Sequence, residues 1–190
     1  ASVGPWASLN LGAGCGDSSA AVQANRAAIA AAIGATPVFL DQVHGAGVVR
    51  LIAADVVAPA RRADASVTTE PGLACTVLVA DCLPVLLAAP QGRGVAAAHA
   101  GWRGLAAGVV EAALAALCEA ARCDPAEVHV WLGACIGPED FEVGADVLQA
   151  FGADPARPGA QRHFTARPGR PGKWLADLPQ LARTRLHAAG

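Results

Sequence analysis

Three side chains that can ligate a metal, His44, Cys82 and His99, each stand where an apolar, strand-like stretch of the sequence ends. They are too far apart in the chain to lie on one helix or in one short knuckle. We expect them to meet at one edge of a sheet, because side chains at neighbouring strand ends converge there. Two imidazoles and a thiolate make up a known catalytic zinc set, in which the fourth position is left for water whose pKa the metal lowers.

Each of these residues also has a purely structural explanation. A single histidine at the end of a strand is more often a hydrogen-bonded surface or core residue than a ligand. Cys82 by itself would be an inert buried thiol. We interpret the other three histidines as structural, since His129, His163 and His187 fall in a strand, a loop and the last helix. Spacing alone therefore leaves two explanations of His44, Cys82 and His99 open, a metal site and purely structural roles.

The elements that must position these residues alternate between strands and helices. Helical spacing or capping signals predict four helices, over residues 18–33, 105–122, 143–151 and 177–187. Short apolar stretches predict strands over residues 37–40, 47–52, 66–69, 73–80, 84–88, 95–98 and 128–132, of which 73–80 reads as buried on both faces. The stretch 154–172 is dense in Pro, Gly and Arg and is expected to be an exposed loop. The order predicts an α/β fold, a single-domain sandwich over residues 1–190 with a mixed, mostly buried β-sheet flanked by helices.

The composition excludes several classes of protein. The chain has 190 residues, of which 54% are hydrophobic and 16% charged, so it can bury a core and is not disordered. No stretch of about 18 apolar residues runs without a charge, Gly or Pro, and we expect no membrane span. The net charge of −2 does not suit a nucleic-acid-binding protein. Because the chain begins at Ala1 and contains no Met, we expect it to be trimmed at both ends.

The six cysteines indicate a reducing compartment. They contain no pair with the spacing of a zinc ribbon or a thioredoxin-type site. Cys75 lies in an apolar stretch and Cys118 in an alanine-rich helix, where a thiol behaves as a small hydrophobic group. A chain this long and apolar does not need disulfides to fold. We therefore expect free thiols and a cytoplasmic location.

Several strings of the sequence occur in the same order in one known family. They are Ser8-Leu-Asn-Leu-Gly12, Asp41-Gln-Val-His-Gly45, Ala63-Asp-Ala-Ser-Val-Thr68, Val79-Ala-Asp-Cys-Leu-Pro-Val-Leu86, Ala97-Ala-His-Ala-Gly-Trp-Arg-Gly104 and Ile136-Gly-Pro138. Through them nearly the whole chain resembles the laccase-domain family, which is YfiH- and YlmD-like and was once labelled multicopper polyphenol oxidoreductase. The pairing of the fourth string with the fifth is highly specific to it.

The resemblance implies both a fold and an activity. The fold is an α/β sandwich shared with some bacterial toxin cysteine hydrolases. The metal is zinc, held by residues that match His44, Cys82 and His99. The activity is phosphorolysis of adenosine, inosine, guanosine or methylthioadenosine, combined with deamination of adenosine. The expected partners are therefore purine nucleosides and phosphate, with no nucleic acid and no membrane, while the oligomeric state stays open.

Further residues fit that chemistry. Asp81, beside Cys82, is the candidate that moves a proton during deamination, although it could equally orient a ligand. Arg103 is the candidate phosphate clamp, since it opens a helix and a guanidinium binds phosphate by two hydrogen bonds. Gln42 and Asn10 are candidate substrate-binding residues on the motif match alone.

Other functions remain open at this stage. Cys82 could act as the nucleophile of a Cys-His hydrolase or amidase, with His99 or His44 as its base. A polyphenol oxidase with bound copper is a weaker alternative, because the chain has five histidines, no His-x-His pair and no Met for an axial ligand. A binding or regulatory domain without turnover is the third.

Overall fold

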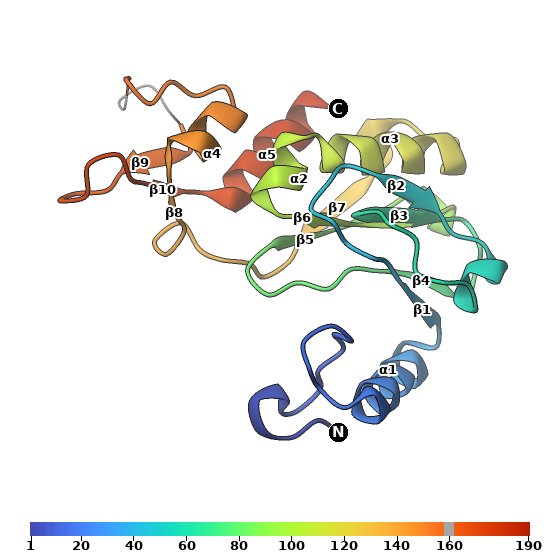
Figure 1. Ribbon diagram of the computed structural model, residues 1–190. Helices are drawn as coiled ribbons and strands as arrows, with labels where there is room; N and C mark the ends of the chain where they lie inside the picture. Colours follow the sequence, from blue (N-terminus) through green and yellow to red (C-terminus); the bar gives the residue numbers. More distant parts are fainter. Residues whose placement is uncertain (158–161) are drawn as a thin grey trace.

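The computed structural model describes residues 1–157 and 162–190, and its elements alternate between strands and helices (Figure 1). The α-helices are α1 (Ser19–Ile33), α2 (Trp102–Ala106), α3 (Val109–Ala121), α4 (Ala145–Ala150) and α5 (Leu178–Ala188). The strands are β1 (Thr36–Phe39), β2 (Val48–Arg50), β3 (Ala65–Thr68), β4 (Leu73–Thr76), β5 (Leu83–Ala88), β6 (Val95–Ala100), β7 (His129–Leu132), β8 (Glu142–Val143), β9 (Phe164–Ala166) and β10 (Trp174–Ala176). The expected α/β fold is confirmed.

The central element is a five-stranded sheet with the order β2-β3-β6-β5-β7. β2 runs parallel to β3, and the remaining neighbours are antiparallel, so the sheet is mixed. The helices α2, α3 and α5 lie over one face of it (Figure 1). β5 shows the result: Leu83, Val85 and Leu87 are buried in the main core, whereas Leu86 is 42% exposed. One face of the sheet therefore packs on the helices, as period-two alternation requires.

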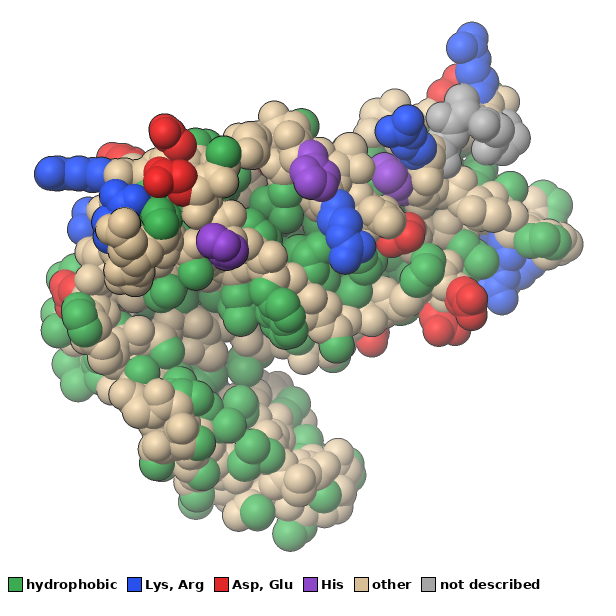
Figure 2. Space-filling model, turned by 180° about the vertical axis from the view of Figure 1, so that it is seen from behind, with side chains coloured by type: hydrophobic (Ala, Val, Ile, Leu, Met, Phe, Trp, Pro, Cys, Tyr) green, Lys and Arg blue, Asp and Glu red, His purple; other side chains and the backbone are tan. Residues whose placement is uncertain are grey.

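Two smaller sheets flank the central one. β1 and β4 pair in parallel, and β8, β10 and β9 form an antiparallel sheet. The N-terminal segment with α1 lies apart from the central sheet and is joined to it through β1 (Figure 1). Seen from behind, a hollow separates this lobe from the rest of the molecule, and hydrophobic side chains line part of its wall (Figure 2). Here the apolar outer face of the sheet, with the paired residues Leu86 on β5 and Trp131 on β7, remains exposed.

Several predicted helix ends and turns are found in the structure. α1 ends where Gly34 adopts a left-handed conformation with φ of 64°, which glycine adopts without steric cost. The turn between β5 and β6 is a hairpin connection, with positive φ at Gln91 and Gly92. α5 begins at a capping residue, since the side chain of Asp177 accepts a hydrogen bond from the backbone N–H of Gln180. No helix within the described residues is long and apolar enough to cross a membrane.

The prediction of a doubly buried strand over residues 73–80 is wrong. β4 ends at Thr76 and its residues are only half-buried, because it pairs only with β1 in a two-stranded sheet. After Thr76 the chain leaves the sheet, and Val79 is 40% exposed.

Three further boundaries differ from the predictions. The expected helix over residues 105–122 is divided into α2 and α3, because Gly108, with a φ of 93°, interrupts the helical conformation between them. The helix expected from Val143 begins at Ala145, since Val143 belongs to β8. The stretch 154–172 is not only exposed loop: it contains β9, whose Phe164 is buried in the main core, while residues 158–161 lie outside the described residues.

Candidate metal centre

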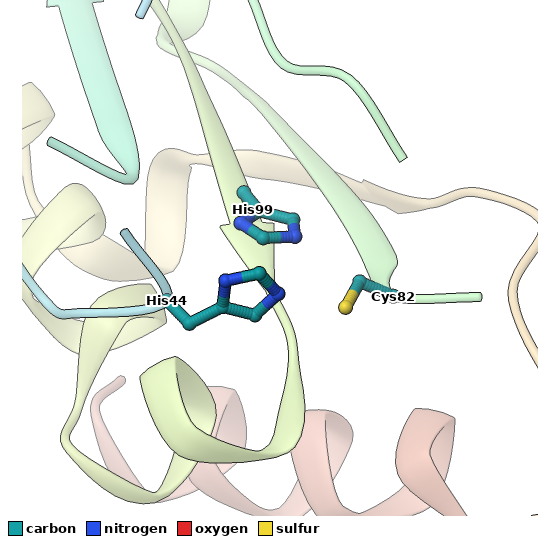
Figure 3. Close-up of side chains that lie close together, drawn as sticks. All are labelled: His44, Cys82 and His99. Atoms are coloured by element: carbon teal, nitrogen blue, oxygen red, sulfur yellow. The ribbon is translucent and has the colours of Figure 1, made fainter. Parts of the chain in front are cut away.

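His44, Cys82 and His99 meet at one end of the central sheet, as the sequence predicts. Their ligand atoms, one per side chain, all lie within 4.8 Å of one another. Figure 3 shows the three side chains pointing toward one another from three different segments. The imidazole rings of His44 and His99 are in edge contact, with centroids 4.7 Å apart and an interplanar angle of 75°.

The register of the sheet explains why these residues meet. β5 and β6 are paired so that Pro84 lies opposite His99, which places Cys82, just before β5, beside the end of β6. His99 lies within β6 rather than after it, because its backbone N–H donates to the carbonyl of Asp64 at 2.7 Å. His44 comes from the bend between β1 and β2 and adopts a left-handed conformation with φ of 60°.

Asp64 connects two of these segments and is a residue of the site that the sequence motifs did not single out. Its side chain is fully buried and accepts a hydrogen bond from Nδ1 of His99 at 2.9 Å. The carboxylate also accepts hydrogen bonds from the backbone N–H groups of Val43, His44 and Gly45, at 3.2, 2.8 and 2.7 Å. Although burial acts to raise the pKa of Asp64, these hydrogen bonds hold that pKa below its ordinary value. A lone acidic residue in the apolar string from Ala63 to Val67 was the available signal.

Cys82 is a half-buried thiol next to negative charge. Burial raises the pKa of Cys82, and the charges of Asp81 and Asp64 raise that pKa further. The backbone of Gly101 lies directly against the thiol, so the site has no room for a larger residue there. Of the three cluster residues, His99 is buried and His44 is exposed, so the cluster is reached from the side of His44.

Asp81 directly precedes Cys82 in the chain, and Arg103 follows His99 by four residues. The side chains of Asp81 and Arg103 are both exposed. The backbone carbonyl of Asp81 accepts a hydrogen bond from the N–H of Ile136 at 2.9 Å, which ties the Cys82 segment to the loop after β7. The guanidinium of Arg103 lies over the ring of Trp102, 4.3 Å from its centroid. Trp102 is half-buried against the main core, so it supports Arg103 from below.

Gln42 and Asn10 both use their carboxamides within the protein. Nε2 of Gln42 donates to the carbonyl of Leu78 at 2.8 Å, and its Oε1 accepts the N–H of Leu78 at 2.7 Å. Nδ2 of Asn10 donates to Asp17 at 3.0 Å, and its Oδ1 accepts the N–H of Gly12 at 3.0 Å. Gln42 therefore links the segment that carries His44 to the one that carries Cys82, whereas Asn10 organises the N-terminal loop.

The donor set fits a zinc ion. Two imidazole nitrogens and one thiolate are ligands that zinc prefers, and three protein ligands leave one position open, as in catalytic sites. Zinc bonds of about 2.0–2.3 Å separate ligand atoms by roughly 3.3–3.8 Å, so small side-chain rotations would complete the geometry. A carboxylate behind one histidine is also typical of such sites, and Asp64 holds that position.

A known family and its members match this chain from end to end. The family model described as "Multi-copper polyphenol oxidoreductase laccase" matches residues 1–190. A protein of Escherichia coli strain K12 named "Purine nucleoside phosphorylase YfiH" is 45% identical over 191 residues, which cover 100% of this chain and 74% of that protein. A purine nucleoside phosphorylase of Pseudomonas aeruginosa is 47% identical over 189 residues, with the same two coverages.

Solved structures confirm the fold. The crystal structure of Neisseria meningitidis protein NMB0706 superposes with a TM-score of 0.88 at 42% identity, and covers 100% of this chain and 74% of its own. YlmD from Geobacillus stearothermophilus superposes with a TM-score of 0.87 at 32% identity, over 100% of this chain and 73% of its own. The resemblance that the sequence motifs indicate is therefore confirmed by both sequence and structure.

Proposed function

The chain belongs to the multi-copper polyphenol oxidoreductase laccase family, and we propose that it is a zinc-dependent purine nucleoside phosphorylase that also deaminates adenosine. One observation carries the proposal: the cluster of His44, Cys82 and His99, with Asp64 behind it, stands in a chain whose relatives bear the name purine nucleoside phosphorylase. Its substrates are then purine nucleosides and phosphate. The six free thiols favour the cytoplasm as its location.

The metal chemistry favours a single hydrolytic centre over copper oxidation. A multicopper oxidase needs a blue-copper site and a trinuclear cluster built from many histidines. Within the described residues, one group of three side chains can hold a metal, and it contains two of the five histidines. A zinc ion held there would supply positive charge and acidify a water molecule.

For deamination, Asp81 is the residue that moves the proton. Asp81 adjoins Cys82 in the chain, its side chain is exposed, and its charge acts on the Cys82 thiol, which supports a role beside a substrate at the cluster. The carboxylate takes a proton from the attacking water and returns it to the departing amino group of adenosine. Asp81→Asn removes this base with little change in shape and is expected to slow deamination by about 100- to 10,000-fold.

For phosphorolysis, Arg103 is the residue that binds phosphate. Phosphate attacks C1′ of the ribose, the bond to the purine breaks, and ribose 1-phosphate and the free base are formed. The guanidinium offers paired donors to phosphate oxygens, and the Trp102 ring beneath it limits its freedom before phosphate arrives.

A Cys-His hydrolase with Cys82 as nucleophile is the competing function. Such a cysteine reacts as a thiolate and is usually activated by a lowered pKa. Here burial and the carboxylates of Asp81 and Asp64 raise the pKa of Cys82, which opposes the thiolate that a free nucleophile needs, whereas a bound cation would stabilise that thiolate.

The test combines metal analysis with nucleoside turnover. Purified protein is analysed for bound metal, and the turnover of adenosine and inosine is measured with and without phosphate and after chelation. We expect about one zinc per chain, phosphate-dependent release of the base from inosine, and loss of both activities on chelation. His44→Ala should lose metal and turnover, whereas His129→Ala, on exposed β7, should keep both. Turnover that survives chelation but stops on alkylation of Cys82 would favour the hydrolase, and no turnover of any nucleoside would favour a binding domain.

A further inference from the structure

Asp64 is a buried carboxylate whose partners all belong to the two histidine segments. Oδ1 accepts Nδ1 of His99 and the backbone N–H of His44, while Oδ2 accepts the N–H groups of Gly45 and Val43. Its one ion-pair partner among the described residues is His99. Burying a carboxylate is costly unless hydrogen bonds satisfy it, and here four donors do so.

We propose that Asp64 is a positioning residue that prepares both histidines of the cluster for the metal, by selecting the tautomer of His99 and by holding the backbone turn at His44. This inference rests on the proposed function, because it assumes that the cluster holds a metal. It assigns a role to a residue that lies outside the ligand set.

The tautomer follows from the donors around the carboxylate. Both oxygens of Asp64 already accept backbone N–H groups, which cannot reverse their direction. The carboxylate is therefore an acceptor toward His99 as well, and Nδ1 of His99 must carry the proton in the neutral ring. The lone pair of that ring is then on Nε2, which is the nitrogen left to bind a metal.

The turn at His44 depends on the same carboxylate. A non-glycine residue in the left-handed region is unusual and costs free energy, so the surrounding structure must hold it there. The N–H groups of three successive residues, Val43 to Gly45, point at Asp64. This cradle fixes the direction in which the His44 side chain leaves the backbone, and so the position of its ring against that of His99.

A purely structural role predicts something different. If Asp64 only held two segments together, its loss would lower stability without a specific effect on the nitrogen that His99 offers to a metal. Asp64→Asn separates the two roles, because the amide has almost the same shape but only one accepting oxygen. Its NH2 group must face either the N–H groups of Val43 and Gly45, or the N–H of His44 together with Nδ1 of His99. The first arrangement opposes the turn at His44, and the second also forces the wrong tautomer of His99.

The matched control is Thr68→Val. Asp64 directly precedes β3, and Thr68 is the last residue of that strand, at the end farther from the cluster. Thr68 is also buried, and its hydroxyl donates a hydrogen bond to the carbonyl of Leu51 at 3.1 Å. Its substitution removes this hydrogen bond and the one that the hydroxyl accepts from the N–H of Glu70 at 3.1 Å, and it keeps the volume nearly constant. It should therefore cost stability without changing the cluster.

The experiment has two readouts that do not use nucleoside turnover. The first is the ¹⁵N chemical shifts of the His99 ring in metal-free wild-type protein, at a pH where the ring is neutral, and it needs no variant to fold. The second is zinc affinity, measured by competition with a chromophoric chelator. We expect the proton on Nδ1, and a loss of zinc affinity of about 10- to 100-fold in Asp64→Asn but not in Thr68→Val. A proton on Nε2 in the wild type, or wild-type zinc affinity in Asp64→Asn, would overturn the proposal. Nucleoside turnover, which tests the proposed function, is measured separately.

Discussion

A β-carbon added to Gly101 would lie 2.8 Å from Sγ of Cys82, so the backbone that leads into α2 lies directly against the thiol. The same β-carbon would lie 3.1 Å from Cδ2 of His44. The φ of Gly101 is −67°, an angle that any residue adopts, so glycine is required here for space and not for backbone conformation. The cluster is thus enclosed by backbone on this side.

Gly101→Ala is therefore expected to disturb the cluster more than the fold. The added methyl must displace the Cys82 thiol or the His44 ring, at a cost of about 1–3 kcal/mol for overpacking. We expect zinc content and inosine turnover to fall at least about tenfold, since a small misplacement of catalytic groups costs up to about 100-fold. Gly137→Ala is the control, because nothing lies within 4 Å of a β-carbon there. If both variants kept wild-type zinc and turnover, the close contact at Gly101 would have no functional consequence.

Arg103→Ala is expected to affect the two proposed activities differently. Phosphorolysis needs phosphate and deamination does not, so the KM for phosphate should rise about 10- to 100-fold, which corresponds to the loss of a charge-assisted hydrogen bond. The rate of adenosine deamination should stay near the wild-type value. Steady-state kinetics at varied phosphate concentration measure both. Arg183→Ala, exposed on α5, is the control, and an unchanged KM for phosphate in Arg103→Ala would assign the clamp elsewhere.

Gln42→Ala is expected to release the segment that leads to Cys82. The carboxamide makes two hydrogen bonds to the backbone of Leu78, and their loss leaves both backbone groups without that partner. We expect a loss of about 1–3 kcal/mol in the free energy of unfolding and faster hydrogen exchange at the Leu78 amide. Gln149→Ala, exposed on α4, should change neither. Unchanged exchange at Leu78 would show that this segment is held without Gln42.

Asp17 should make the stability of the N-terminal lobe, the segment that contains α1 and the residues before it, decrease at acid pH. Hydrogen bonds from Asn10 and Ser2, with one from the Ser18 backbone N–H, hold the pKa of Asp17 below its ordinary value of 3.8. A lowered folded-state pKa gives stability that is complete above the ordinary value and is lost as the pH falls through the folded-state pKa. Denaturant unfolding between pH 5 and about pH 2 should therefore show a steeper loss of stability below pH 3.8 in the wild type than in Asp17→Asn.

The control for this prediction is Asp140→Asn, at an exposed position outside the N-terminal lobe. Its stability should follow the wild-type pH dependence. Identical curves for the wild type and Asp17→Asn would mean that these hydrogen bonds do not favour the ionised carboxylate.

The three candidate ligands could be singled out from the sequence because each interrupts or ends an apolar stretch. A histidine is seldom fully buried unless its polar atoms are paired, so one that stands at the end of an apolar stretch is conspicuous. The same logic predicts β5 and β6 and the turn between them. It fails for residues 77–80, which are as apolar as a buried strand but pair with no strand among the described residues.

Asp64 and Gln42 show what one-dimensional patterns leave out. Asp64 stands two residues before Ser66 in a short string, and nothing in that string tells that its carboxylate faces His99 and the turn at His44. Gln42 matches a motif and could equally have faced a substrate, but its carboxamide lies on Leu78. The partners of the Asp64 carboxylate and of the Gln42 carboxamide both depend on which strands are neighbours.

Composition and local pattern therefore determined the class of fold and singled out His44, Cys82 and His99 as candidate ligands, since both depend on residue types and on short-range periodicity, and the motif strings indicated the family of this protein. The tertiary structure decided which side chains hold those ligands in place. The parallel pairing of β2 with β3 and the antiparallel pairing of β3 with β6 bring the His44 turn, Asp64 and His99 together. Strand order is a property of the whole sheet, because each pairing is stabilised by contacts between residues that are distant in the chain.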